Sequence, residues 1–409
     1  MRILFTAIWP THLMPLVPLG WALRAAGHQV LVAGPADVAA TGVKAGLPAM
    51  EIDETPPAGP PPVTVADRAR RRVDTFLPGY RAAAEAFEPD LVVTDPLEWN
   101  ALIVGGLLGV PVVHVRFGPG ELPDTALRAA REALRETCQR LGLAGGLPGP
   151  DLIVDPTPPG LQTQGLSPAQ PVRYVVYNGP GVLPPALAAG PRPGRRRVLV
   201  FFSVDGLTDR EPVVDQVETL LRACGALPRT ETLVAASAWL RERLGESPAL
   251  AGGSVRVIDP VPLHLLLDDC ALVVHHGGHG VSGTAAVHGV PQAVVIPPMP
   301  EGPRRELLTD CAERVRACGA GRWLDDPAVL ADPERITAVL AEALDDPAHR
   351  AAADRLRAGV LALPTPADLV GTLESLCKER AGADTHRGYL AHSSDDHGAD
   401  GLGTALGGS

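Results

Sequence analysis

Short apolar runs alternate with longer amphipathic stretches along most of the chain, and this alternation predicts strands connected by helices. The first apolar run, at residues 3–7, is followed by a polar turn around Thr11. Apolar side chains then recur at helical spacing over residues 16–26, and Gly27 ends the predicted helix. A second strand is expected at residues 29–33. A strand, a helix and a second strand in this order predict a parallel, doubly wound sheet.

The alternation continues through the first half and starts again in the second. In the first half, a strand at 91–95 leads into a helix at 97–108 and a strand at 111–115. In the second half, strands are expected at 198–202, 232–236, 254–258, 271–274 and 292–296, and helices at 212–224, 262–268, 280–289, 304–318, 333–363 and 366–379. The fold class is therefore α/β, with two Rossmann-like halves.

Breaks in this pattern suggest where the domains begin and end. Residues 142–171 are rich in glycine and proline and show no periodicity, and a polar, basic linker precedes Val198. We therefore expect an N-terminal domain over residues 1–190 and a C-terminal domain over 195–365. Residues 55–62 form an expected proline-rich loop. Residues 381–409 have few large apolar side chains and are expected to be a disordered tail.

Composition narrows the function classes. A chain of 409 residues with 45% hydrophobic residues suits two domains. The net charge of −11, without a basic block, argues against binding nucleic acid or an anionic membrane. The six cysteines are scattered without a CxxC pair, which is typical of reduced thiols. We find neither a signal peptide nor an apolar run of membrane-spanning length, so we expect a cytoplasmic protein.

The segment that follows the predicted strand at 271–274 has the composition of a phosphate-binding turn. Two histidines, His275 and His276, precede three glycines within four residues, and a helix is expected to start at once. Glycines let the backbone approach an anion, and a helix N-terminus presents unpaired amides. Ser282 adds a hydroxyl in the first turn. An ordinary glycine-rich turn is the alternative, but the paired histidines favour a diphosphate site. On the same sheet edge, Val261-Pro262 offers an apolar shelf for a nucleobase.

Two polar residues follow strands of the first half at one expected sheet edge. His12 comes after the first strand, where ligands bind in open α/β folds, and an imidazole there can act as a general base. A histidine packed against Trp9 or Trp21 is the alternative. Asp95 ends another strand and can orient that imidazole, or cap the helix that starts at Pro96. The two roles of Asp95 are compatible.

Several segments in one order now resemble a known family. The sequence resembles the GT-B glycosyltransferases of actinobacterial natural-product pathways, in particular the desosaminyl- and erythromycin-type enzymes that attach deoxysugars to macrolide and aromatic polyketide aglycones. The resemblance extends to about residue 380. The matching segments are THLMPLVPLGWA at 11–22, RAAGHQV at 24–30, PDLV at 89–92, YNGP at 177–180, VHHGG at 274–278, HGVPQ at 288–292, GAG at 319–321 and DDPAHR at 345–350.

The resemblance implies two Rossmann-like domains facing across a cleft, with a final helix at 366–380 that crosses back to the N-terminal domain. The N-terminal domain would bind a hydrophobic aglycone and the C-terminal domain a dTDP-sugar, in an inverting displacement that uses no metal and no cofactor beyond the donor. His12 falls on the catalytic base and Asp95 on its supporting carboxylate. The expected diphosphate contacts are His275, His276, Gly277, Gly278, Gly280, Val281 and Ser282. Val261 and Pro262 are expected at the nucleoside, and Trp9, Met14 and Phe117 at the acceptor.

The sequence departs from the family where the sugar is usually held. Family members carry an Asp-Gln or Asp-Thr pair after the strand ending near Pro297, whereas this chain reads PMPEGPRR at 298–305. Glu301 is expected to replace the aspartate, with Asp310 as a rival. Some macrolide members need an auxiliary protein that resembles a cytochrome, and the same need is a hypothesis here. The chain is expected to act as a monomer or homodimer in antibiotic biosynthesis.

Two other functions fit the same pattern. A C-glycosyltransferase would attack through an aromatic carbon, with Asp95 as a base. A non-catalytic homologue would assist a true transferase. The joint presence of His12, Asp95 and His276 favours an enzyme.

Overall fold

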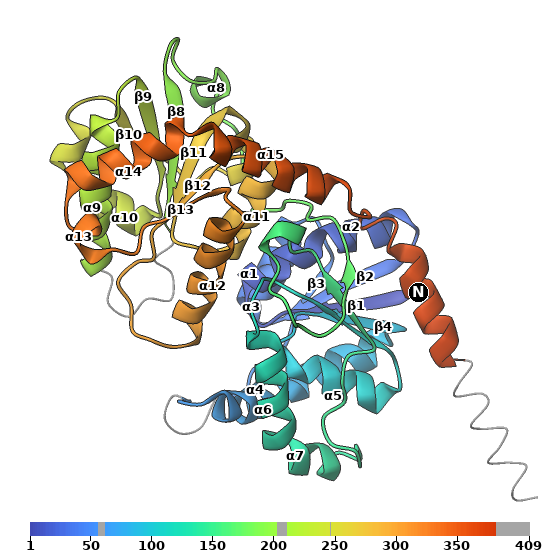
Figure 1. The fold of residues 1–409 in the computed structure, drawn as a ribbon. Helices are drawn as coiled ribbons and strands as arrows, with labels where there is room; N and C mark the ends of the chain where they lie inside the picture. The colour runs from blue at the N-terminus through green and yellow to red at the C-terminus, as the bar shows by residue number, and fades with distance from the viewer. Residues whose placement is uncertain (56–61, 203–210, 246, 382–409) are drawn as a thin grey trace, which may run out of the picture.

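The structure is a computed structural model, and it describes residues 1–55, 62–202, 211–245 and 247–381 (Figure 1). Most of the predicted loop at 55–62 and nearly all of the predicted tail at 381–409 lie outside the described residues. The described chain forms two parallel sheets, each covered by helices on both faces.

The first sheet contains seven parallel strands in the order β3-β2-β1-β4-β5-β6-β7. The strands are β1 (Arg2–Thr6), β2 (Gln29–Gly34), β3 (Ala49–Glu51), β4 (Leu91–Thr94), β5 (Val112–Val115), β6 (Leu152–Asp155) and β7 (Gln170–Pro171). The direction of winding reverses between β1 and β4, and ligands bind at such a point in open α/β sheets.

The second sheet repeats this order with six parallel strands, β10-β9-β8-β11-β12-β13. They are β8 (Arg196–Phe201), β9 (Thr230–Ala235), β10 (Val255–Ile258), β11 (Cys270–His275), β12 (Gln292–Val294) and β13 (Gly321–Trp323). Here the winding reverses between β8 and β11. The expected class of two Rossmann-like halves is therefore confirmed.

Helices connect successive strands in both halves. They are α1 (Pro10–Leu13), α2 (Val17–Ala25), α3 (Ala36–Lys44), α4 (Val65–Phe87), α5 (Trp99–Leu108), α6 (Leu122–Ala133), α7 (Arg135–Arg140), α8 (Pro185–Ala188), α9 (Glu211–Ala226), α10 (Ala238–Leu244), α11 (His279–His288), α12 (Pro303–Ala317), α13 (Pro327–Leu330), α14 (Pro333–Asp345) and α15 (Pro347–Leu361). Short 3₁₀ turns are η1 (Met14–Leu16), η2 (Pro159–Leu161), η3 (Pro248–Leu250), η4 (Leu263–Leu265) and η5 (Leu267–Asp269). Residues 370–381 are also helical.

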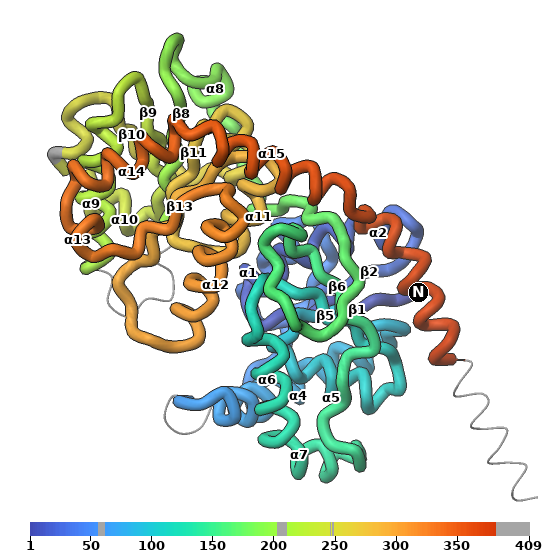
Figure 2. The backbone as a smooth tube through the Cα atoms, viewed as in Figure 1, coloured from blue at the N-terminus to red at the C-terminus, as the bar shows by residue number. Residues whose placement is uncertain are grey.

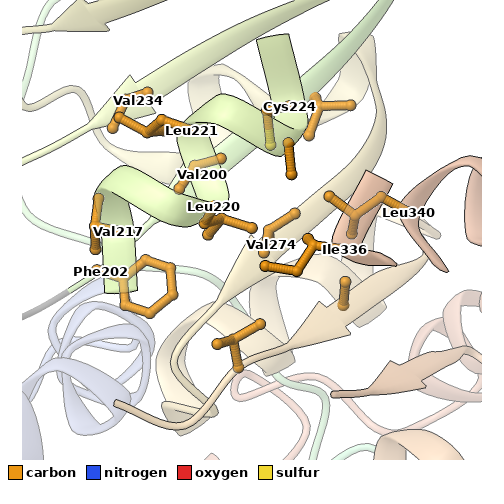
Figure 3. Close-up of a cluster of buried hydrophobic side chains, with 14 of the residues drawn as sticks. Val200, Phe202, Val217, Leu220, Leu221, Cys224, Val234, Val274, Ile336 and Leu340 are labelled. Carbon is orange, nitrogen blue, oxygen red and sulfur yellow. The ribbon is translucent and has the colours of Figure 1, made fainter. Parts of the chain in front are cut away.

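Alternate side chains of the central strands enter cores on opposite faces of each sheet, as the strand period of two requires. In β8, Val198 and Val200 pack on one face and Leu199 on the other. Figure 3 shows the first of these cores, where apolar side chains of α9 fill the space between the sheet and Leu340 of α14. The cores on the two faces of the sheets are thus mainly aliphatic, as the low aromatic content of the sequence implies.

The C-terminal end of the described chain returns to the first half. Figure 2 shows the path from α15 to a helix beside the N-terminal sheet. Leu369, Val370 and Leu373 lie in the core that contains Ile3 and Phe5 of β1. The hydrophobic core of the first half therefore includes side chains that follow the second sheet in the sequence.

Two expected helices differ in the structure, and other segments form elements that the sequence pattern did not indicate. The helix expected at 262–268 is two separate 3₁₀ turns, interrupted at Leu266. The helix expected at 333–363 breaks at Asp346, which caps α15 ahead of Pro347. The segment at 142–171, which shows no periodicity in the sequence, contributes β6 and β7. The sequence pattern also failed to indicate α4, whose first turn has a capping box between Thr64 and Asp67.

Candidate active site

His12 and Asp95 meet at the point where the first sheet reverses its winding. His12 lies in α1, just after β1, and Asp95 directly follows β4. The His12 Nδ1 atom is 3.1 Å from Asp95 Oδ1. Asp95 is fully buried and also accepts the backbone amides of Ile8 and Leu97, at 2.7 and 2.9 Å. The bond from Leu97 holds the turn that follows β4, but α5 begins only at Trp99 with Glu98 as its N-cap, so the expectation that Asp95 caps a helix starting at Pro96 was wrong.

Asp95 is held as a carboxylate. Burial acts to raise the pKa of Asp95, but the charge and hydrogen bond of His12, together with the two backbone amides, outweigh it and lower that pKa. An ionised carboxylate only accepts hydrogen bonds, so His12 donates from Nδ1–H. In the neutral imidazole, this leaves Nε2 as the basic nitrogen.

Aromatic rings enclose His12. The Phe117 ring stacks on it, with centroids 4.0 Å apart and planes at 30°, and the Trp9 ring meets it edge-on at 5.3 Å. Trp9 is 51% exposed, so it offers an apolar face to solvent. Trp21 lies elsewhere, against Tyr177, which removes it from the alternative interpretation of His12. Met14, the third expected acceptor residue, packs on the core under β1.

The glycine turn after β11 is shaped by His275. The Gly277 amide donates to His275 Nδ1 over 3.1 Å, and His275 Nε2 lies 2.9 Å from Gln292 Oε1. Because Nδ1 accepts, Nε2 carries the proton and donates to Gln292. Burial lowers the pKa of His275 to about 3. Gly277 has φ of +90°, which favours glycine. His275 thus has both nitrogens engaged inside the protein, so its side chain offers no open nitrogen to a diphosphate.

His276 is placed differently from its neighbour. Its ring lies near Phe201 and Phe202 and over Gly278, where a Cβ atom would be 2.5 Å from Nε2. Its Nδ1 atom is buried and has no hydrogen-bond partner among the residues the structure describes. Burial lowers the pKa of His276 to about 4, so the ring is neutral near pH 7. A neutral, buried imidazole with one unpaired nitrogen can take a ligand atom.

The helix α11 begins directly after this turn. Gly278 is its N-cap and supplies no side chain to the first amides, those of His279, Gly280 and Val281. The Ser282 hydroxyl is buried beside the Cys311 thiol, and Thr284 donates to the Gly280 carbonyl. The open donors at this end are therefore backbone amides, with the positive end of the helix dipole behind them.

The other residues expected to bind the sugar donor lie outside the glycine turn. Glu301 is 87% exposed, and its carboxylate is 3.1 Å from Arg305 Nε. Asp310, on α12, is half-buried, and burial raises the pKa of its carboxyl. Val261 is buried in a core, and Pro262 packs against Gly181.

The loop at 117–120, between β5 and α6 of the first half, contacts the second half near His12 and near the start of α11. A Cβ atom on Gly118 would lie 2.5 Å from the His279 ring, and one on Gly120 would lie 2.5 Å from Asp310 Oδ2. The loop also carries Phe117, which stacks on His12. His12 and the start of α11 thus face each other across this loop. His279 lies within the expected glycine turn, but no pattern in the sequence indicated a role for it.

The described ranges contain neither a metal-binding cluster nor a membrane-spanning helix. Residues 1–55, 62–202, 211–245 and 247–381 contain no group of three or more histidine, cysteine or acidic side chains arranged to hold a metal ion. In the same ranges, no helix has the length and apolarity needed to cross a bilayer.

Comparisons with known proteins identify the family to which this chain is similar. Residues 63–202 match the N-terminal domain of the erythromycin biosynthesis protein CIII-like family, and residues 219–376 match its C-terminal domain. The 3-alpha-mycarosylerythronolide B desosaminyl transferase of Saccharopolyspora erythraea is 33% identical, over 93% of this chain and 99% of its own.

Solved structures of a glycosyltransferase are also similar to this chain. A spinosyn rhamnosyltransferase complexed with thymidine diphosphate has 35% sequence identity and a TM-score of 0.79, over 91% of this chain and 100% of its own. The same enzyme complexed with spinosyn aglycone gives the same identity, coverage and TM-score. The fold and the site define a glycosyltransferase with two Rossmann-like halves. Within that class, the chain belongs to the erythromycin biosynthesis protein CIII-like family, which confirms the resemblance.

Proposed function

We propose that this glycosyltransferase moves a deoxysugar from a thymidine-diphosphate sugar to a hydroxyl group of a polyketide-type aglycone, with inversion at the anomeric carbon. The observation that carries the proposal is the His12–Asp95 pair, which lies across the 117–120 loop from the N-terminus of α11. A base for the acceptor and a site for the leaving diphosphate are thus close together. A relative that binds thymidine diphosphate and an aglycone supports the two substrate classes.

His12 is the proposed general base. Its Nε2 atom takes the proton from the acceptor hydroxyl as the oxygen attacks the anomeric carbon. Asp95 orients the ring through Nδ1 and stabilises the imidazolium that forms. Trp9 and Phe117, the aromatic neighbours of His12, provide apolar contact for an aglycone.

The leaving diphosphate is proposed to bind at the start of α11. The amides of Gly280 and Val281 can donate to its oxygens, and the helix dipole stabilises its charge. His276, whose ring lies over Gly278 at the N-cap of α11, is proposed as a further contact to the diphosphate. His275 then supports the turn from below rather than touching the diphosphate. Because these groups already meet the developing charge, we propose a reaction without a metal ion.

The sugar and the nucleoside of the donor are proposed to contact residues outside the glycine turn. Asp310 is the better candidate for the sugar, because it is half-buried at the contact between the halves, whereas Glu301 faces solvent beside Arg305. Val261 and Pro262 remain the proposed shelf for the nucleobase. Action in the cytoplasm as a monomer or homodimer, and assistance by a cytochrome-like protein, stay predictions.

The first test of this function compares the wild type with His12→Ala and Asp95→Asn. Purified protein is screened against a panel of dTDP-sugars by thermal shift, and transfer is then measured with polyketide aglycones. We expect His12→Ala to lower kcat by about 100- to 10,000-fold, the range typical of a lost general base. Asp95→Asn should also lower kcat, because an amide can leave His12 in the wrong tautomer.

Calorimetric titration with thymidine diphosphate is the control, and its affinity should be similar in all three proteins. Full transfer activity in His12→Ala would remove the base assignment. A carbon–carbon anomeric bond in the product, detected by NMR, would assign a C-glycosyltransferase instead. Absence of thymidine diphosphate binding in the wild type would point to a non-catalytic homologue.

A further inference from the structure

The contact between His279 and the 117–120 loop links the two ends of the active site. His279 is the first residue of α11, where the diphosphate is proposed to bind. A Cβ atom built on Gly118 would lie 2.5, 2.6 and 2.8 Å from Cε1, Nε2 and Nδ1 of His279. The nitrogen-bearing edge of the ring therefore lies directly on the Gly118 backbone. Only glycine allows this close approach without displacing the ring.

The loop transmits this contact to His12. Phe117 precedes Gly118, and its ring stacks on His12 at 4.0 Å. Asp310 and Leu307 of α12 contact the loop again at Gly120, which has φ of +106°. The Gly120 amide also donates to Thr163 Oγ1 over 3.1 Å. The second half thus contacts the loop at Gly118 and at Gly120. The same loop contacts His12 through Phe117.

We propose that His279 is a positioning residue, which holds the 117–120 loop so that Phe117 keeps the His12 imidazole in its reactive orientation when the donor is bound. This inference rests on the proposed function of His12 and α11. It adds that the donor half sets the geometry of the base in the acceptor half. A ligand at the start of α11 would order His279, and through Gly118 and Phe117 it would order His12.

The chemistry of His279 suits this role. Burial lowers its pKa to about 4, and the nearby His12 adds to the effect. The ring is therefore neutral near pH 7 and adds no positive charge next to His12. Asp95 remains the ion-paired partner of His12 in the structure. A rigid, neutral ring is suited to holding a loop in place.

The test uses four variants: His279→Ala, Gly118→Ala, the double variant, and His288→Ala as a matched control. His288 lies at the other end of α11 and pairs with the exposed Asp268. With histidines labelled at ¹³Cε1, thymidine diphosphate is added to saturation and the His12 signal is followed by NMR. We expect the His12 signal to shift and sharpen in the wild type and in His288→Ala, and to respond little in His279→Ala.

Kinetics with the donor and acceptor found in the screen give the second readout. His279→Ala and Gly118→Ala should lower kcat by about 10- to 100-fold, the loss expected when a reacting group moves by roughly 1 Å. The KM for the donor should change by less than about threefold, because the amides of α11 remain. The double variant should be no slower than His279→Ala, since the methyl group added in place of Gly118 then meets no ring.

The outcomes separate the two hypotheses. If the wild type neither binds thymidine diphosphate nor transfers sugar, the proposed function fails first. If the wild type is active, an unchanged kcat in His279→Ala overturns the positioning role. A rise in donor KM alone would also overturn it, because His279 would then act on the donor only. Should Gly118→Ala fail to fold, as judged by circular dichroism, His279→Ala still decides the question.

Discussion

At the scale of single residues, the surroundings of each histidine determine what its ring can do. His12 has a carboxylate partner and one free nitrogen. His275 has both nitrogens engaged by the protein, and His276 has one buried nitrogen without a partner among the described residues. Burial lowers the pKa of His275 and of His276, because it disfavours the charged imidazole. Adjacent positions in the chain thus have different chemistry.

The buried histidines make stability depend on pH, and His114 offers a test away from the active-site turn. Burial lowers the pKa of His114 in β5 to about 4, against the effect of the nearby Asp95 and Asp124 and with that of Arg131. The unfolded chain binds this proton below about pH 6.5 and the folded chain does not, so stability falls as pH drops from about 6.5 to 4. Each such histidine contributes a slope of about 1.4 kcal/mol per pH unit.

We expect the free energy of unfolding of His114→Leu to fall less steeply with acid than that of the wild type, by about that slope. Guanidinium titrations at pH 5, 6 and 7 measure the difference. Equal slopes for the two proteins would show that His114 titrates normally in the folded state.

At the scale of elements, a buried ion pair joins α4 to α5. Glu98, the N-cap of α5, is fully buried and accepts hydrogen bonds from Arg72 Nε at 2.8 Å and from the Tyr80 hydroxyl at 3.1 Å. It also accepts the Asn100 side-chain amide at 2.7 Å. This network lies behind Asp95, since the charge of Arg72 also interacts with that carboxylate. It fixes the start of α5 relative to α4.

Removing Arg72 should therefore be costly, because it leaves a charged carboxylate buried and unpaired. We expect Arg72→Met to lower the free energy of unfolding by about 3–5 kcal/mol. The matched change, Arg81→Met, removes an exposed pair with Glu85 from the same helix and should cost less than about 1 kcal/mol. Chemical denaturation of both variants gives the comparison, and similar losses would contradict the role of the buried pair.

At the scale of the whole molecule, the C-terminal helix packs on the N-terminal half. The helical residues 370–381 follow the second sheet but pack on the first, where Leu373 is fully buried. Glu374 pairs with His28, and Arg380 pairs with Asp151, at 3.1 and 3.0 Å. The N-terminal sheet thus depends on residues far along the chain. The expected domain boundaries at 190 and 195 stay predictions.

This arrangement predicts a local effect from a distant substitution. Leu373→Ala should destabilise the first half by about 2–5 kcal/mol, through lost burial and the cavity it leaves. Leu361→Ala, at a position 46% exposed at the end of α15, should cost less than about 1 kcal/mol. Hydrogen exchange followed by mass spectrometry should show faster exchange in β1 and β2 for Leu373→Ala, with β8 and β11 unchanged. Faster exchange confined to the second sheet would contradict this topology.

The sequence by itself determined the class of fold, the approximate positions of most strands, and three pieces of the site: His12, Asp95 and the glycine turn. These could be predicted because strand periodicity is local, and because residues that follow parallel strands emerge at one edge of a sheet. The strands β6 and β7 were missed because the sequence around them shows no periodicity. The helix expected at 333–363 is two helices because Pro347 interrupts it.

Only the tertiary structure decided how these pieces combine. It engaged both nitrogens of His275 and left one nitrogen of His276 unpaired among the described residues, and it placed His279 against Gly118. It also left Glu301 in solvent and placed Asp310 at the contact between the halves. Each of these outcomes depends on which distant segments pack together, and burial and hydrogen-bond partners are properties of that packing rather than of local sequence.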